Sequence, residues 1–280
     1  MKDTKRGALD AEALEFFAQK GREGGPNVPQ AGLANGVKVR RVMQIVADLA
    51  GKPFDRLRIL DLGCGEGVYS IEAALHGAQV LAVDARRERM DNGAAIAERH
   101  GLDNVEFIQA DVRKMSAEAY GTFDVVFFLG LLYHLDAPEL FPLLEAIYGM
   151  CERMLLIDTL VALEPREHFE WKGTRYEGVK WRAHDDGDPP EVRLGRLLRS
   201  IDSTFAFRLT PESLHAALHH TGFTSVHGCH VPFEPGKADD RLTLAALKGS
   251  AVRLSTYPWV NDRSEAKIRE ILAGDGPGNG

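Results

Sequence analysis

Acidic residues and glycines are concentrated at residues 61–67, which read Asp-Leu-Gly-Cys-Gly-Glu-Gly. The segment lies between a short apolar run and a stretch that favours a helix. Because glycine lacks a Cβ atom, the backbone at Gly63 and Gly65 can turn tightly and approach a ligand closely. The first turn of the following helix leaves N–H groups available to the same ligand. The segment therefore predicts a nucleotide-binding loop led by the carboxylate of Asp61.

Two further carboxylates follow apolar runs that are typical of buried strands. Asp84 and Ala85 directly follow one such run, at a distance from the glycine loop where the acid can accept from both ribose hydroxyls. Asp111 follows the next run, where it can accept from an adenine amino group while the N–H of Val112 meets a ring nitrogen. Because parallel strands end at one edge, Asp61, Asp84 and Asp111 predict a single binding edge.

Apolar runs and helix-compatible segments alternate along the chain, as a doubly wound α/β sheet requires. The expected strands lie at residues 57–62, 79–83, 105–109, 123–129, 153–159, 223–229 and 241–247. The expected helices lie at residues 39–49, 69–76, 87–99, 138–150 and 210–221, with another amphipathic segment at 9–17. The last two strands are joined by a loop with proline and glycine rather than by a helix, so we expect them to pair antiparallel.

Four segments, in this order, resemble the successive motifs of class I S-adenosylmethionine-dependent methyltransferases: residues 61–67, 83–85, 109–112 and 123–135. The resemblance extends over about residues 37–248. It implies an α/β, Rossmann-like fold with a mostly parallel seven-stranded sheet, an antiparallel last strand and helices on both faces. A NAD-dependent oxidoreductase is the main alternative for a glycine-rich loop, but it leaves the positions of Asp111, Tyr133 and His134 unexplained.

The resemblance also implies S-adenosylmethionine as the cofactor. The cofactor-binding residues that it implies are Asp61, Gly63, Gly65, Asp84, Ala85, Asp111, Val112, Leu129 and Gly130. Asp84 would hold the ribose, Asp111 with Val112 the adenine, and the glycine loop the methionine end. Leu129 and Gly130 would present carbonyl groups to the amino group of the cofactor.

Catalysis of methyl transfer needs little beyond geometry, because a sulfonium methyl group is already activated. An oxygen or nitrogen acceptor also loses a proton, which favours a nearby base. His134 is the first candidate, and its alternative is a histidine that begins a helix and bonds to the backbone. Tyr133 is expected to line the cofactor or orient the acceptor. Glu170 is a second candidate base, with an ordinary exposed position as its alternative.

The expected organisation has five parts: an N-terminal helix and linker at 1–35 that could close as a lid, a cofactor-binding part at 36–160, a substrate-covering insertion at 161–209, the remainder of the methyltransferase domain at 210–249, and a C-terminal extension at 250–280. Five aromatic residues outside the core are candidates for substrate binding, namely Phe16, Phe17, Trp171, Tyr176 and Trp181. The alternative is that they pack these segments onto the core.

Two other patterns have both a functional and a structural interpretation. Arg193, Arg196 and Arg199 have helical spacing and could face an anionic substrate group, although such a row is more often a solvated helix face. His215 and His219 share a helix face, but no matching carboxylate or zinc-protease pattern accompanies them. We expect no metal site.

Composition narrows the class of substrate. The net charge of −7 disfavours a broad phosphate-binding surface, so we expect methylation of an O, N or electron-rich C atom of a small, partly apolar metabolite rather than of a nucleic acid. Two alternatives stay open. Residues 128–160 also resemble the transferases that modify the tRNA wobble uridine at its 5-oxygen, and the fold could serve as a non-catalytic cofactor-binding scaffold.

The cellular setting follows from cysteine usage and hydropathy. Cys64, Cys151 and Cys229 lack the spacing of a metal or redox motif and fit a reducing compartment. The N-terminal residues lack the apolar stretch of a signal peptide, and no run is long enough to span a bilayer. We expect a cytoplasmic protein without a membrane partner, and leave a homo-oligomer open.

Overall fold

A computed structural model describes residues 36–196, 199–230 and 239–250, together with residues 264–266, 269 and 273. The chain divides into a unit of residues 1–249 and a unit of residues 250–280, and the fold that follows is that of the first unit. The expectations for residues 1–35, including Phe16 and Phe17, lie outside the described residues. The same holds for most of the C-terminal extension.

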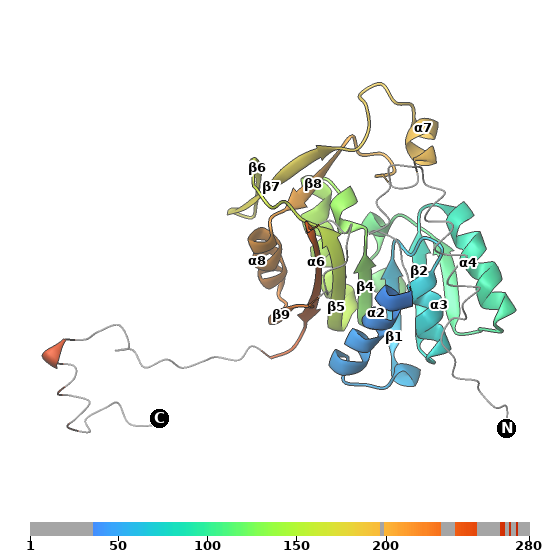
Figure 1. Cartoon of the computed structure of the whole chain (residues 1–280), viewed down its shortest axis with the longest axis horizontal. Coiled ribbons are helices and arrows are strands. Elements are labelled where there is room, and N and C mark those ends of the chain that lie inside the picture. The colour runs from blue at the N-terminus through green and yellow to red at the C-terminus, as the bar shows by residue number, and fades with distance from the viewer. Residues whose placement is uncertain are drawn as a thin grey trace. The chain divides into compact units, whose positions relative to one another are not determined.

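Helices and strands alternate over residues 36–160 as the sequence predicts, and further strands at residues 167–182 interrupt this alternation (Figure 1). The helices are α2 (Gly36–Leu49), α3 (Val68–Leu75), α4 (Arg87–Arg99), α5 (Ala117–Tyr120), α6 (Ala137–Met150), α7 (Pro190–Gly195) and α8 (Pro211–Thr221). The strands are β1 (Arg58–Leu62), β2 (Gln79–Asp84), β3 (Val105–Gln109), β4 (Phe123–Leu129), β5 (Cys151–Leu160), β6 (Glu167–Trp171), β7 (Thr174–Arg182), β8 (Phe205–Leu209), β9 (Ser225–Gly228) and β10 (Arg241–Leu247).

The central sheet has seven strands in the order β3-β2-β1-β4-β5-β10-β9. Strands β1 to β5 pair in parallel, whereas β10 runs antiparallel between β5 and β9. The predicted Rossmann-like methyltransferase sheet with an antiparallel last strand is confirmed. Because β1, β2, β3 and β4 are parallel, the residues after them emerge at one edge of the sheet.

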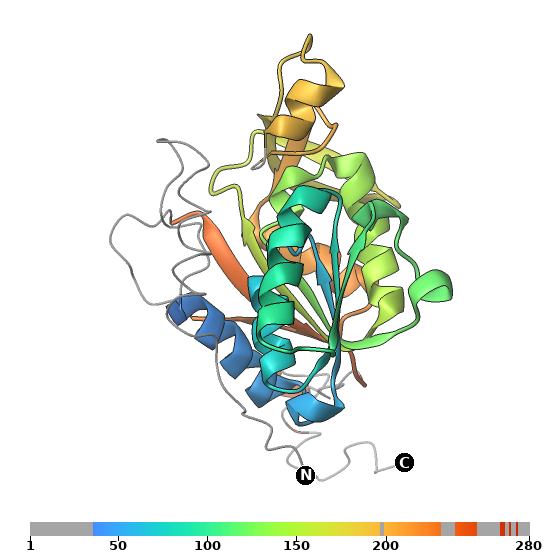
Figure 2. The same cartoon turned by 90° about the vertical axis from the view of Figure 1, so that its right-hand side faces the viewer.

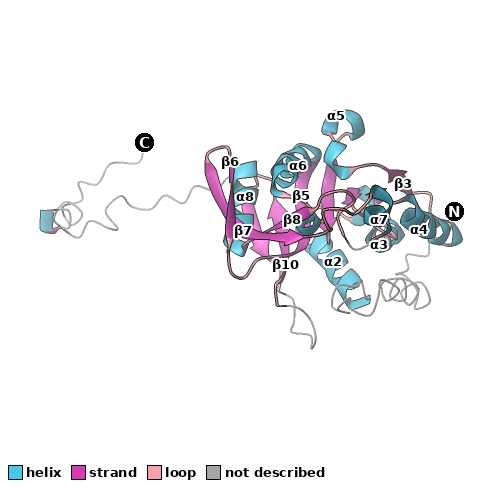
Figure 3. Cartoon of the chain, turned by 90° about the horizontal axis from the view of Figure 1, so that it is seen from above, coloured by secondary structure: helices cyan, strands magenta, loops and turns pink. Residues whose placement is uncertain are grey.

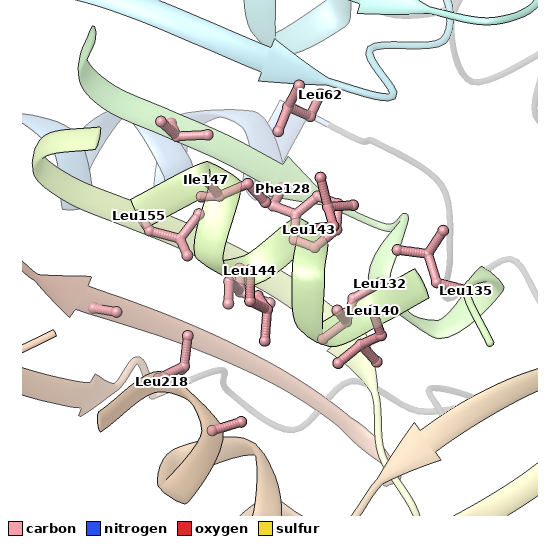
Figure 4. Close-up of a cluster of buried hydrophobic side chains, with 14 of the residues drawn as sticks. Leu62, Phe128, Leu132, Leu135, Leu140, Leu143, Leu144, Ile147, Leu155 and Leu218 are labelled. Atoms are coloured by element: carbon pink, nitrogen blue, oxygen red, sulfur yellow. The ribbon is translucent and has the colours of Figure 1, made fainter. Parts of the chain in front are cut away.

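Helices cover both faces of this sheet, as Figure 2 shows from the side. One hydrophobic cluster joins α2, α3 and α4 to one face and includes Val46, Ile71 and Phe127. The other cluster joins α6 and α8 to the opposite face, and Figure 4 shows Leu143 and Leu144 of α6 near Phe128. Burial of the sheet on both faces explains why its central strands read as continuous apolar runs.

The insertion at 161–209 forms a second, three-stranded antiparallel sheet in the order β6-β7-β8. Helix α8 lies against this small sheet (Figure 3). The backbone N–H of Phe207 in β8 donates to the carbonyl of Leu135 at 2.8 Å, which ties this small sheet to the loop after β4. Because of this bond, the small sheet lies beside the segment that carries Tyr133 and His134. The sequence predicted an insertion here but not its strands.

None of the helices at described positions combines the length and the apolar character needed to cross a membrane.

Candidate active site

The glycine loop between β1 and α3 adopts a conformation that depends on glycine. Gly63 and Gly65 have φ values of 73° and 58°, in the left-handed region that side chains with a Cβ rarely adopt. A Cβ atom on Gly65 would lie 2.7 Å from Nη2 of Arg89. The N–H of Gly63 donates to the carbonyl of Val83 at 2.8 Å, which ties the loop to the end of β2.

Asp61 lies at the end of β1 and is only 2% exposed. The hydroxyl of Ser70 donates to its Oδ2 at 2.6 Å. Burial raises the pKa of Asp61 to about 7; the hydrogen bond from Ser70 opposes this shift, and the negative charge of Asp84 adds to it. Near neutral pH the carboxyl group is therefore divided between its charged and neutral forms.

Asp84 ends β2, and its carboxylate joins the glycine loop to the start of α4. Its Oδ2 accepts from the N–H of Gly65 at 3.0 Å, and its Oδ1 accepts from the N–H of Arg86 at 2.9 Å. Each carboxylate oxygen has a further lone pair, so both retain capacity for ligand hydroxyls. Beside it, the carbonyl of Ala85 accepts from the side chain of Gln109 at 3.0 Å.

Asp111 has a strong partner that the sequence analysis missed. The guanidinium of Arg113 binds its carboxylate through Nε and Nη2, and the same guanidinium reaches Glu139 in α6 and Asp202 in the insertion. Burial alone would raise the pKa of Asp111, but the hydrogen bonds from Arg113 outweigh it and lower the pKa. The adjacent Val112 is buried at the start of a short 3-10 turn. Adenine recognition by Asp111 and Val112 stays a prediction.

Arg86 provides a second link to the insertion. Its guanidinium donates to the carbonyls of Leu194, Arg196 and Arg199 at 3.1 to 3.2 Å. Figures 1 and 3 agree in placing α7 above α3 and α4. These bonds hold the insertion over the edge of the sheet at which Asp84 emerges.

The turn after β4 packs against a buried ion network. The N–H of Gly130 donates to the carbonyl of Asp158 at 2.7 Å, and the Asp158 carboxylate binds Lys38, Arg241 and Thr243. Burial alone would raise the pKa of Asp158, but Lys38 and Arg241 lower it below its ordinary value. Leu129, just before Gly130, is partly buried against the helices on one face of the sheet.

Arg241 brings this network to Tyr133. Its guanidinium lies 5.8 Å from the centre of the Tyr133 ring. The sequence analysis missed Arg241. Its position was predictable, because an antiparallel last strand begins at the edge of the sheet where its parallel neighbours end. Arg241 is the first residue of that strand.

His134 follows Tyr133, and the two ring centres are 4.2 Å apart. Burial lowers the pKa of His134 to about 3, and the positive charges of nearby arginines, Arg86 and Arg208 foremost, lower it further. The imidazole is therefore neutral at pH 7, as a base must be, but its low pKa makes it a weak one. A role as a base stays a prediction.

Two of the three insertion aromatics proposed for the substrate pack instead on the core. Trp171 stacks on Phe141 of α6 with ring centres 5.9 Å apart, and Tyr176 packs on the same ring in a tilted arrangement at 4.6 Å. The indole N–H of Trp171 donates to Glu145 at 3.1 Å, and the Tyr176 hydroxyl lies 2.8 Å from Nδ1 of His220. Their large apolar rings fill the space between the small sheet and α6, so the alternative interpretation holds for both.

Trp181 differs from the other two, because its side chain is 38% exposed. The guanidinium groups of Arg208 and Arg199 lie 4.8 and 5.2 Å from its ring centre. Trp181, Arg199 and Arg208 are called the Trp181 cluster below.

Glu170 is exposed and pairs in register with Arg175, six residues along β7 from Trp181 and therefore about 20 Å away from it. Its role as a second candidate base stays a prediction. The arginine row, namely Arg193, Arg196 and Arg199, is neither a solvated face nor a free anion site, because these side chains bond to Asp188, Asp202 and Ala183 within the insertion.

Among the described residues, no group of three His, Cys, Asp or Glu side chains is arranged to hold a metal ion. The three cysteines are free thiols.

Known proteins agree with this architecture. Residues 59–153 match the model of a family described as a methyltransferase domain. Ubiquinone biosynthesis O-methyltransferase of Acinetobacter baumannii (strain AYE) is 29% identical over 104 residues, which are 37% of this chain and 42% of that protein. The protein of the same name from Caulobacter sp. (strain K31) is 37% identical over 86 residues, 31% of this chain and 34% of that protein. The matches thus span less than half the length of these relatives.

Solved structures extend the likeness beyond the matched segment. The N-terminal domain of EvdMO1, crystallised in the presence of SAH and D-fucose, superposes with a TM-score of 0.60 at 21% identity, covering 89% of this chain and 100% of that one. Magnesium protoporphyrin IX methyltransferase from Synechocystis PCC 6803 with bound SAH gives a TM-score of 0.51 at 18% identity, covering 84% and 98%. Residues 59–153 are therefore similar to a methyltransferase domain, and the first unit shares the fold of these solved structures.

Proposed function

We propose that the protein transfers a methyl group from S-adenosylmethionine to an O, N or electron-rich C atom of a small, partly apolar metabolite. The observation that carries the proposal is the joint position of the glycine loop and Asp84, within a segment that matches the methyltransferase domain family. Likeness to O-methyltransferases of small molecules supports the class of acceptor.

The chain's own residues fit such a cofactor. The left-handed glycines leave the loop open to a ligand, and Asp84 can accept from ribose hydroxyls while it holds the loop. Asp61 supplies a buried negative charge for the cationic end of the cofactor. When bound, S-adenosylmethionine would supply a methyl group activated by the sulfonium.

The acceptor would lie between the turn after β4 and the insertion. Tyr133 and His134 line this side, and Arg86 and Arg113 hold the insertion over it. A covered site excludes water and holds the acceptor in line with the methyl group. His134 and Tyr133 would position the acceptor atom, and the neutral imidazole would accept its proton where the acceptor must lose one.

Calorimetry with S-adenosylhomocysteine tests the cofactor part of this proposal. We expect binding by the wild-type protein and a loss of about 100-fold in affinity for Asp84→Ala, because two hydrogen bonds to a charged group are removed. Asp91→Ala is the matched control, since Asp91 is an exposed acid that pairs only with Arg87 among the described residues. Absent binding, or equal affinity in both variants, would contradict the proposal.

The transferase that modifies tRNA is the alternative outcome, since residues 128–160 resemble that group. It predicts binding of tRNA that weakens steeply as the salt concentration rises. A scaffold that only binds the cofactor would bind S-adenosylhomocysteine without transferring a methyl group to any fraction of cell extract.

A further inference from the structure

One face of the small sheet carries a cationic and aromatic surface beside the candidate active site. In β8, Phe207 and Leu209 point into the core, so Ala206 and Arg208 point to the opposite face. Trp181 pairs in register with Ala206 and therefore shares this face with Arg208. The Trp181 cluster is thus built from two neighbouring strands and the segment that α7 precedes.

Among the described residues, the partly buried guanidinium of Arg208 is weakly paired. Its Nε is buried without a hydrogen-bond partner, and its ion pair with Asp240 spans 3.8 Å. Oδ1 of Asp240 is likewise buried without a partner, and these are the two such side-chain atoms in the described part of the chain. An unpaired buried donor is costly to the folded protein, and the exposed part of the guanidinium remains able to bind an added carboxylate.

The cluster faces the acceptor side of the candidate site. The strand that carries Arg208 is bonded to Leu135, next to His134, through the N–H of Phe207. Charge interactions support this placement. The pKa of His134 is lowered mainly by burial, then by the positive charge of Arg86 and then by that of Arg208. Burial in turn lowers the pKa of Arg208, and its interactions with Asp240 and Tyr133 oppose that shift. Arg208 belongs to β8 of the insertion, whereas the glycine loop lies between β1 and α3.

We propose that the acceptor is a small carboxylic acid whose carboxylate binds the guanidinium of Arg208 and whose apolar body packs on Trp181. The planar fork of arginine matches a carboxylate through two parallel hydrogen bonds. The exposed indole offers a flat apolar surface at low entropic cost. This inference rests on the proposed function and names the class of its substrate.

A second carboxylate could reach the same guanidinium, namely that of the methionine part of the cofactor. The position of Arg208 in the insertion favours the acceptor, because the glycine loop and Asp61 belong to other elements. The two sources are separated by measuring cofactor binding and acid binding in the same variants.

The test uses the full chain saturated with S-adenosylhomocysteine. The probes are 4-hydroxybenzoate, 4-hydroxycinnamate and indole-3-acetate, each compared with its methyl ester, and binding is measured by calorimetry and saturation-transfer NMR. We expect at least one acid to bind about tenfold or more tightly than its uncharged ester. Arg208→Gln should lose about tenfold in affinity for that acid, and Arg208→Lys should lose less because it keeps the charge.

Matched variants separate this role from a structural one. Arg182→Gln is the control, because Arg182 lies on the opposite face of β7, where it contacts Phe205. It should leave acid binding unchanged, and all three arginine variants should bind S-adenosylhomocysteine as the wild type does. Trp181→Ala gives a second variant at an exposed position should Arg208→Gln unfold, and it should weaken acids and esters alike.

Several outcomes would overturn the proposal. These are binding of no acid by the saturated protein, equal binding of acids and esters, or unchanged acid binding in Arg208→Gln and Trp181→Ala. Weaker cofactor binding in Arg208→Gln with unchanged acid binding would assign Arg208 to the methionine carboxylate instead. Failure of the wild-type protein to bind S-adenosylhomocysteine would contradict the proposed function and not the class of acceptor.

Discussion

At the scale of single residues, we expect Asp61 to make cofactor binding depend on pH. Its pKa of about 7 means that the carboxyl group is largely protonated below neutral pH. Because the ammonium of S-adenosylhomocysteine favours the charged form, we expect its affinity to fall about tenfold per pH unit below pH 7 and to level off above it. Calorimetry between pH 5.5 and 8.5 measures this dependence. Asp61→Asn should bind more weakly at pH 8 and show no such slope.

The stability of the ligand-free protein should move in the opposite direction. The folded pKa of Asp61 exceeds its ordinary value of 3.8, so the folded state holds the proton more tightly than the unfolded chain. This contribution to stability is present below about pH 4 and is lost as the pH rises through 7.

For cofactor binding, a pH slope of the affinity that persists in Asp61→Asn would show that a group other than Asp61 is responsible.

His134 gives a second prediction about protonation. Burial and the neighbouring arginines lower its pKa from 6.5 to about 3, so the ring stays neutral throughout the physiological range. Its contribution to stability is complete above pH 6.5 and is lost as the pH falls towards 3. In ¹⁵N NMR spectra of the imidazoles, the signals absent from His134→Gln should not titrate between pH 8 and 5. A midpoint near 6.5 for those signals would refute the desolvated environment.

The sequence predicted the acids at the strand ends better than it predicted their cationic partners. Asp61, Asp84 and Asp111 were found because each follows an apolar run, a pattern set by local sequence. Arg113 and Arg208 act on residues far along the chain, and no local period reports a contact of that range. Only the fold brings Asp202 to Arg113.

At the scale of elements, the insertion depends on Arg86. Arg86→Ala removes three hydrogen bonds to carbonyls at residues 194–199. We expect amide hydrogen exchange at residues 190–204 to become about tenfold faster, since even one such bond contributes about 1 kcal/mol. Arg87→Ala is the control, because Arg87 is exposed and pairs with Asp91. Equal exchange in both variants would mean that other contacts hold the insertion.

The two sheets differ in how well the sequence predicted them. The predicted strands at 105–109, 123–129 and 241–247 coincide with β3, β4 and β10. The clearest signal is that of β4, because a strand buried on both faces forms an unbroken apolar run. The strands β6 and β7 carry many charged residues on an exposed face, so no such run marks them. Their aromatic residues were therefore interpreted as pocket residues, although Trp171 and Tyr176 face the core.

At the scale of the whole molecule, the sheet holds two hydrophobic clusters together. Phe127 is fully buried in the cluster of α2 and α3. Phe127→Ala should therefore lower the free energy of unfolding by about 3–5 kcal/mol, through lost burial and the cavity that remains. Val37→Ala, at a position 53% exposed on α2, should change it by less than about 0.5 kcal/mol. Urea unfolding measures both values, and a loss below about 1 kcal/mol for Phe127→Ala would contradict the assigned core.

The claim that unites these scales is methyl transfer to a small molecule. The most direct measurement incubates the protein with methyl-labelled S-adenosylmethionine and a cell extract separated into metabolite and RNA fractions. We predict label in the metabolite fraction with the wild-type protein, and its loss with Asp84→Ala but not with Asp91→Ala. Label in tRNA alone, or in neither fraction while S-adenosylhomocysteine still binds, would contradict the account.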